Sequence, residues 1–101
     1  MLVLNQSRFI SLFKFKNMAK VTIYTTPSCT FCKQTKEFYQ ANNVEYEEKD
    51  VSQDTAAAQE MVDKSHQMGV PVSMITKEGE ADPKIIIGFD KAALSEALGL
   101  N

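Results

Sequence analysis

The sequence predicts an α/β fold in which a small mixed sheet of four strands carries helices on both faces. The first observation is the alternation of strand-like and helix-like periodicities along the chain, in the order β-α-β-α-β-β-α. The second is that a strand, a helix and another strand in succession require a right-handed parallel crossover. The third is the short connection between the last two strands, which is typical of an antiparallel hairpin that joins the same sheet.

The first strand is expected at residues 20–25, where Val21 and Ile23 alternate with Thr22 and Tyr24. The Thr-Pro-Ser sequence of residues 26–28 interrupts this pattern, and residues 29–42 then show the period of an amphipathic helix. Its apolar stripe consists of Phe31, Thr35, Phe38, Tyr39 and Asn42. We expect the following Asn42-Asn43 pair to end the helix.

The second strand is expected at residues 44–51, which begin with alternating apolar and acidic side chains. Either Ser52 or Asp54 is a suitable N-cap for the next helix, and Gly69 is a suitable end. The buried stripe of this helix is predicted to contain Ala57, Ala58, Met61, Val62 and Ser65.

The last three elements are a hairpin and a helix. Residues 71–76 and 84–87 are expected to form its two strands, with turn residues at 77–80. Asp90 is expected to cap the final helix, where Phe89 and Leu94 have the spacing of a hydrophobic staple and Gly99 lies near the end.

Length and composition limit the class of protein. The 101 residues, of which 44% are hydrophobic and 24% charged, leave room for one globular domain, which we assign to residues 20–101. Residues 1–19 carry no acidic side chain and are treated as an N-terminal extension: a leader, an organellar presequence or surface helix, or a secretory signal. Residues 21–101 carry 7 basic and 13 acidic side chains, which argues against a nucleic-acid surface. No apolar run approaches the roughly 18 residues that span a bilayer, so we expect no membrane partner.

The two cysteines, Cys29 and Cys32, carry the chemistry that the sequence predicts. A single close pair is unlike the several crosslinks of a small secreted domain, so we expect a reducing, cytoplasmic setting. Cys29 lies at the predicted helix start, where the N-terminus of a helix lowers a thiol pKa from ~8.5 to about 3.5–7.5. Cys29 is therefore the expected nucleophile. Cys32, one turn later and within disulfide reach, is the expected resolving thiol.

Neighbouring residues have alternative interpretations. Lys33 is either a charge that assists the thiolate or a solvated helix residue, and Thr26 and Ser28 either donate to sulfur or shape the turn. Phe31 is either a docking contact or a core residue, and its place in the stripe favours the core. His66 is interpreted as a polar residue at a helix end. A zinc site is not expected, because His66 is the only other soft ligand and tetrahedral zinc needs four.

Three motifs resemble those of small glutaredoxins, which have the thioredoxin fold, and the resemblance covers residues 20–100. They are T-T-P-S-C-T-F-C after the first strand, M-G-V-P-V from Met68 to Val72, and G-F-D-K from Gly88 to Lys91. The resemblance implies that Pro71 is cis and lies opposite the active cysteine, and that the Val70 backbone pairs with an extended substrate or with glutathione. Without the resemblance, Pro71 is simply a proline that opens a strand.

The chain also departs from the pattern of glutaredoxins that use glutathione. Thr30-Phe31 replaces Pro-Tyr between the cysteines, Thr26 replaces a basic residue, and a single Gly88 replaces Gly-Gly before the last helix. These departures weaken the expected binding of glutathione, although Asp90 is still a candidate for its amino group as well as a helix cap. The G-F-D-K motif resembles redoxins that take electrons from thioredoxin reductase, including those that serve ribonucleotide reductase.

The sequence therefore predicts a monomeric thiol-disulfide oxidoreductase of the glutaredoxin type that reduces protein disulfides or glutathione mixed disulfides. Cys29 and Cys32 are the predicted catalytic residues, and Val70, Pro71, Gly88 and Asp90 the predicted substrate- or glutathione-binding residues. No bound cofactor is expected; glutathione is a candidate co-substrate, and glutathione or thioredoxin reductase is the expected electron donor. Two alternatives are a carrier that holds a metal or iron–sulfur cluster through Cys29 and external thiols, and a noncatalytic binding module.

Overall fold

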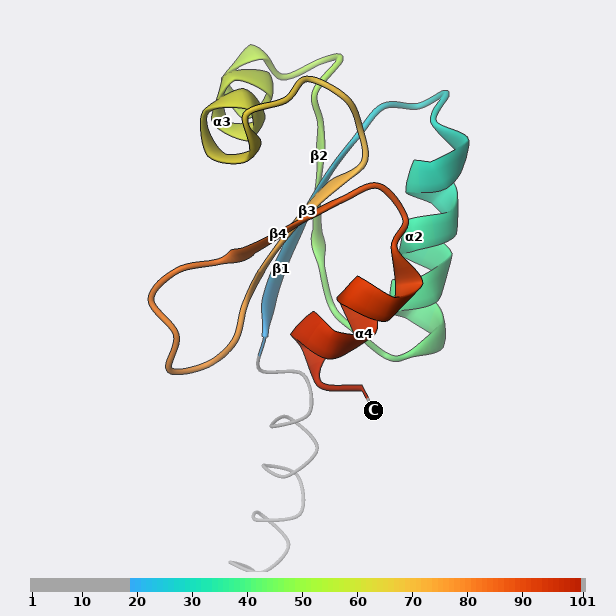
Figure 1. Cartoon of the computed structure of the whole chain (residues 1–101). Helices are drawn as coiled ribbons and strands as arrows, with labels where there is room; N and C mark the ends of the chain where they lie inside the picture. The colour runs from blue at the N-terminus through green and yellow to red at the C-terminus, as the bar shows by residue number, and fades with distance from the viewer. Residues whose placement is uncertain (1–18, 101) are drawn as a thin grey trace, which may run out of the picture.

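The structure is a computed structural model that describes residues 19–100 (Figure 1). The predicted order of strands and helices is confirmed within this range. The predicted N-terminal extension lies outside the described residues except for Ala19, so its role stays a prediction. The elements are β1 (Lys20–Thr25), α2 (Thr30–Ala41), β2 (Glu47–Asp50), α3 (Thr55–Ser65), β3 (Val72–Thr76), β4 (Lys84–Ile87) and α4 (Lys91–Leu98).

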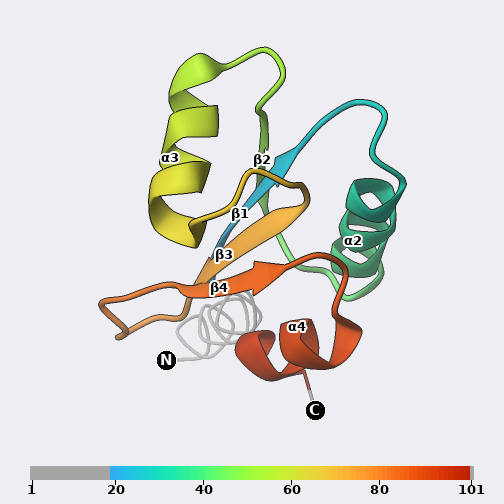
Figure 2. The same cartoon turned by 45° about the horizontal axis from the view of Figure 1, so that its top comes forward.

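The four strands form one mixed sheet in the order β2-β1-β3-β4. β1 and β2 are parallel, whereas β3 runs antiparallel to both β1 and β4. Figure 2 shows α3 on one face of the sheet and α2 with α4 on the other, so helices cover both faces as predicted. Within residues 19–100, no helix is long and apolar enough to cross a membrane.

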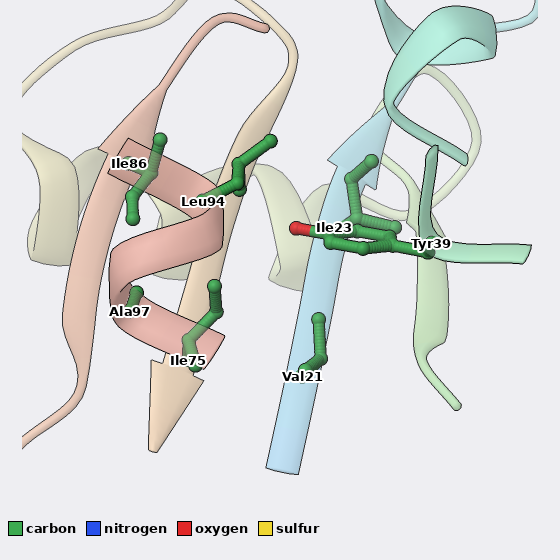
Figure 3. Close-up of a cluster of buried hydrophobic side chains, with 7 residues drawn as sticks. All are labelled: Val21, Ile23, Tyr39, Ile75, Ile86, Leu94 and Ala97. Carbon is green, nitrogen blue, oxygen red and sulfur yellow. The ribbon is translucent and has the colours of Figure 1, made fainter. Parts of the chain in front are cut away.

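Two apolar clusters hold these layers together. Because side chains alternate across a strand, Val21 and Ile23 of β1 face α2 and α4, whereas Tyr24 faces α3. The first cluster, shown in Figure 3, contains Val21, Ile23, Tyr39, Ile75, Ile86, Leu94 and Ala97. The second contains Tyr24, Ala57, Met61 and Val72.

The helix starts follow the predicted capping chemistry. Asp54, not Ser52, caps α3, because its Oδ1 accepts a hydrogen bond from the Ala57 N–H at 3.0 Å. Asp90 caps α4 in the same way, accepting from the Ala93 N–H at 3.1 Å. Phe89 packs against the cluster that contains Leu94, as the predicted staple requires.

Two predicted boundaries were wrong. The second strand is Glu47–Asp50 rather than 44–51. These four residues are in register with β1, and Val51 adds one hydrogen bond from its N–H to the Thr25 carbonyl at 2.9 Å, whereas the Val44 N–H donates to the Tyr39 carbonyl at 2.9 Å, at the end of α2. α3 ends at Ser65 rather than near Gly69. His66 takes the left-handed conformation with φ 61°, which ends the helix and redirects the chain toward β3. The interpretation of His66 as a helix-end residue is confirmed.

Candidate redox site

Three connecting segments meet at one end of the sheet, where β1 and β4 end and β3 begins. They are residues 26–29 after β1, 66–71 before β3, and 88–90 after β4; Figures 1 and 2 show them together near the start of α2. One hydrogen bond joins two of these segments directly, since the Gly88 N–H donates to the Pro71 carbonyl at 2.9 Å. The topology thus gathers Cys29, Val70, Pro71, Gly88 and Asp90, all predicted site residues, at the same end of the sheet.

Cys29 is the N-cap residue of α2. Its backbone is extended, with φ −86° and ψ 114°, and its Sγ accepts a hydrogen bond from the Cys32 N–H at 3.0 Å. A serine or aspartate oxygen usually fills this role, so here a sulfur takes one of the unpaired N–H donors at the helix start. The Cys29 N–H donates to the Thr26 carbonyl at 3.3 Å, which closes the turn before the helix.

Cys29 and Cys32 form a disulfide with a Cα–Cα distance of 5.2 Å. The two residues differ in exposure: Cys29 is half-buried, whereas Cys32 is only 1% exposed. Cys32 belongs to the buried stripe of α2 together with Thr35 and Tyr39. A partner can therefore approach the sulfur of Cys29, while Cys32 lies behind it against the sheet.

The residues that the resemblance implied lie at the same end of the sheet as this pair. The Val70–Pro71 peptide bond is cis, Pro71 is buried and Val70 is half-buried. Gly88 has φ 79°, a conformation that favours glycine, and the exposed Asp90 already uses one carboxylate oxygen as the cap of α4. Their binding roles stay predictions, to which the structure adds only their common location.

Phe31 is exposed, which corrects the preference for a core position. Its side chain is 60% exposed, although it lies between two residues of the helix start that hold the disulfide. Seven residues further along α2, Phe38 is covered, and its ring lies 6.1 Å from that of Phe89. Met68, two residues before Val70, is 80% exposed. Two large apolar side chains are thus open to solvent in the segments that form the site.

A polar cluster of Thr25, Lys36 and Glu48 joins β1, α2 and β2 and was not predicted from the sequence. The Glu48 carboxylate accepts a hydrogen bond from the Thr25 hydroxyl at 2.7 Å and pairs with the Lys36 ammonium at 2.9 Å. Both hydrogen bonds lower the pKa of the Glu48 carboxyl below its usual range, and the bond from Lys36 has the larger effect. The signal in the sequence was weak, because the contact joins three separate elements.

A second ion pair lies on the opposite face of the sheet. Lys49 and Tyr24 both contact the Glu60 carboxylate, at 3.0 and 2.7 Å, beneath α3. Burial and the Glu60 hydrogen bond raise the pKa of the Tyr24 hydroxyl. Among residues 19–100, no three His, Cys, Asp or Glu side chains are arranged to hold a metal ion.

The arrangement defines a class of protein: a redox protein with a C-x-x-C disulfide at the start of the helix that follows the first strand of a small mixed sheet. Comparison with known proteins agrees with this class. The glutaredoxin family model matches residues 21–79, more than half of the chain. An uncharacterised glutaredoxin-like 8.6 kDa protein in the rubredoxin operon of Clostridium pasteurianum is 37% identical over 78 residues, covering 77% of this chain and 96% of that protein.

Solved structures show the same fold. The crystal structure of a thioredoxin-like protein is 34% identical, covers 76% of this chain and 97% of that one, and superposes with a TM-score of 0.65. The glutaredoxin-like NrdH-redoxin of Escherichia coli, whose structure is described together with a thioredoxin-like activity profile, shares the fold at 22% identity, with 76% and 92% coverage and a TM-score of 0.63. The chain belongs to the glutaredoxin family and has the thioredoxin fold, as predicted.

Proposed function

We propose that this protein is a thiol-disulfide oxidoreductase that reduces protein disulfides in a reducing compartment such as the cytoplasm. The observation that carries the proposal is the position of the Cys29 sulfur, which caps α2 and accepts the Cys32 N–H at 3.0 Å. A thiolate at this position gains the same hydrogen bond and the positive end of the helix dipole. Cys29 is therefore activated without a separate base.

The reaction consists of two exchanges. The Cys29 thiolate attacks one sulfur of the substrate disulfide, forming a mixed disulfide and releasing the other sulfur as a thiolate. Cys32 then loses its proton and attacks Cys29, which breaks the mixed disulfide and releases the second substrate thiolate. The substrate gains two electrons, and the Cys29–Cys32 disulfide forms. A donor, either glutathione or thioredoxin reductase, must then reduce this disulfide.

The exposed apolar side chains support a protein as the substrate. Phe31 adjoins the reacting cysteine, and its 60% exposure leaves an aromatic ring free for a partner to cover. Thr26 stands where glutaredoxins that use glutathione carry a basic residue, so one cation for a glutathione carboxylate is missing. We therefore place Val70, Pro71 and Gly88 under the extended segment of a protein substrate, with glutathione as the weaker candidate.

The proposal is tested by NADPH oxidation with either glutathione plus glutathione reductase or thioredoxin reductase as donor. Insulin serves as the protein disulfide and cystine as the small one. We expect turnover of both with the wild-type protein and none with Cys29→Ser. If neither donor supports turnover that depends on Cys29, the proposed function is wrong.

The choice of substrate is tested by Phe31→Ser. Loss of a half-exposed aromatic contact is worth about 1 kcal/mol, so kcat/KM for insulin should fall about fivefold while that for cystine is unchanged. The matched control is Leu100→Ser, which removes another exposed apolar residue. Leu100 follows Gly99, which adjoins Lys77 at the other end of β3, so this variant should leave both values unchanged. Equal losses for both substrates would contradict a role of Phe31 in docking proteins.

A further inference from the structure

The cluster of Thr25, Lys36 and Glu48 lies on the face of the sheet that α2 covers. Thr25 continues the alternation of Val21 and Ile23 on this face, and Glu48 pairs with Ile23 across the β1–β2 ladder. Lys36 follows Cys32 by four residues, so the two side chains are neighbours on the helix surface. The ion pair therefore places one positive and one negative charge beside the helix turn that holds Cys32.

Charges near Cys32 matter because this thiol must ionise while buried. Cys32 is 1% exposed, and burial opposes the formation of a thiolate, so its ionisation is sensitive to nearby charges even though the Lys36 and Glu48 side chains are 28% and 38% exposed. Besides Lys36 and Glu48, the surrounding elements carry other titratable groups: Lys33, Glu37 and Tyr39 on α2, Glu47, Lys49 and Asp50 on β2, and Asp90, Lys91 and Glu96 in α4 and its cap. β1 and β3 contribute the uncharged buried residues Thr25 and Ser73.

Lys36 and Glu48 differ from these other groups because they form an ion pair with each other. The Thr25 hydroxyl, on a residue that is 2% exposed, anchors the Glu48 carboxylate at 2.7 Å, and this carboxylate in turn holds the Lys36 ammonium at 2.9 Å. Both hydrogen bonds favour the ionised carboxylate. The structure therefore holds the two opposite charges together on this face of the sheet.

Resting on the proposed function, we propose that Lys36 and Glu48 are positioning residues that control the resolving step in opposite directions. The Lys36 ammonium favours loss of the Cys32 proton, and the Glu48 carboxylate opposes it. In the ion pair these two effects oppose each other. If the ion pair only stabilised the fold, replacing either residue would change the rate of the resolving step in the same direction.

The reaction of the reduced protein with dithiobis(nitrobenzoate) separates the two steps. In the first phase the Cys29 thiolate displaces one thionitrobenzoate and forms a mixed disulfide. In the second phase Cys32 releases its proton to solvent and attacks Cys29, and the second thionitrobenzoate leaves. Each phase releases one coloured product, so stopped-flow absorbance measures both rates in one experiment.

We expect Glu48→Gln to accelerate the second phase and Lys36→Met to slow it. A tenfold change in the thiolate fraction of Cys32 is partly offset by the opposite change in its nucleophilicity, which leaves about a threefold change in rate. The pH midpoint of the second phase should fall in Glu48→Gln and rise in Lys36→Met. The double variant Lys36→Met/Glu48→Gln should return toward the wild-type rate, because it removes both charges.

The matched control is Lys49→Met, which breaks the ion pair with Glu60 on the other face of the sheet. Its second phase should equal that of the wild type. Changes in the same direction for Glu48→Gln and Lys36→Met, or no change in either, would overturn the inference. Absence of the first phase in the wild-type protein would instead overturn the proposed function, and the inference with it.

Discussion

Replacing Tyr39 by phenylalanine tests the link between the helix that carries the cysteines and the strand that follows Pro71. The Tyr39 hydroxyl donates to the Ser73 Oγ at 2.6 Å, and both residues are 0% exposed. Figure 3 shows the hydroxyl oxygen directed across β1 from α2. The Tyr39→Phe change keeps the ring, which lies 5.4 Å from that of Tyr46, and removes only the hydrogen bond.

The expected loss follows from the buried partner that remains. Among residues 19–100 the Ser73 hydroxyl has no second hydrogen bond, so the variant leaves it unpaired, at a cost of about 2 kcal/mol. For a domain of this size that loss lowers Tm by roughly 10 °C. The Ser73→Ala variant should lower the free energy of unfolding by a similar amount, because it leaves the buried Tyr39 hydroxyl without a hydrogen-bond partner. The double variant replaces both polar groups and should recover most of the loss.

Urea unfolding of the oxidised proteins, followed by circular dichroism, measures all four free energies of unfolding. The reasoning is refuted if the double variant loses the sum of the two single losses, because the hydroxyls would then act independently. The first phase of the dithiobis(nitrobenzoate) reaction should keep its wild-type rate in every variant, since Cys29 does not contact this pair.

Three further predictions concern the site and its frame. The Cys32→Ser variant should stop after the first exchange, so that mass spectrometry finds a stable mixed disulfide on Cys29; its absence would contradict the assigned order of attack. Asp54→Ala removes the cap of α3 and should lower the free energy of unfolding by about 1 kcal/mol, and an unchanged urea midpoint would show that the cap is not needed. Burial raises the pKa of Tyr39 to about 12, from an unfolded value of ~10. The unfolded chain then ionises first, so the stability contributed by Tyr39 is full below pH ~10 and should fall by about 1 kcal/mol by pH ~11, measured as the extra loss of the wild type relative to Tyr39→Phe; an equal pH dependence of the two proteins would contradict the burial effect.

The sequence predicted the sheet and its covering helices because the spacing of hydrophobic residues in each segment shows which face is buried. Val21 and Ile23 alternate because one face of β1 packs against α2 and α4, and Asp54 and Asp90 cap helices through contacts only three residues away. The ends of the strands and helices were harder to predict. Val44 is apolar because it packs beside α2, not because it belongs to β2, and hydrophobicity alone does not distinguish these positions.

The sequence predicted those parts of the candidate site that depend on residues close together in the chain. Cys29 and Cys32 lie within one helical turn, so their geometry depends on the helix start alone. Phe31 was placed wrongly because its exposure depends on Phe89, which covers Phe38 but not Phe31. The contact of Glu48 with Thr25 and Lys36 depends on the register of β1 against β2, which no local pattern of charges specifies.

The unequal exposure of the two sulfurs also determines how the protein responds to peroxide. An oxidant reaches Cys29, which is half-buried, before Cys32, which is 1% exposed, so a sulfenic acid forms first on Cys29. Cys32 is close enough to condense with it, releasing water and forming the disulfide that the structure contains. This reaction competes with further oxidation to the sulfinic acid, which thiols do not reverse. The buried cysteine thus keeps oxidative damage at Cys29 in a form that an ordinary reductant repairs.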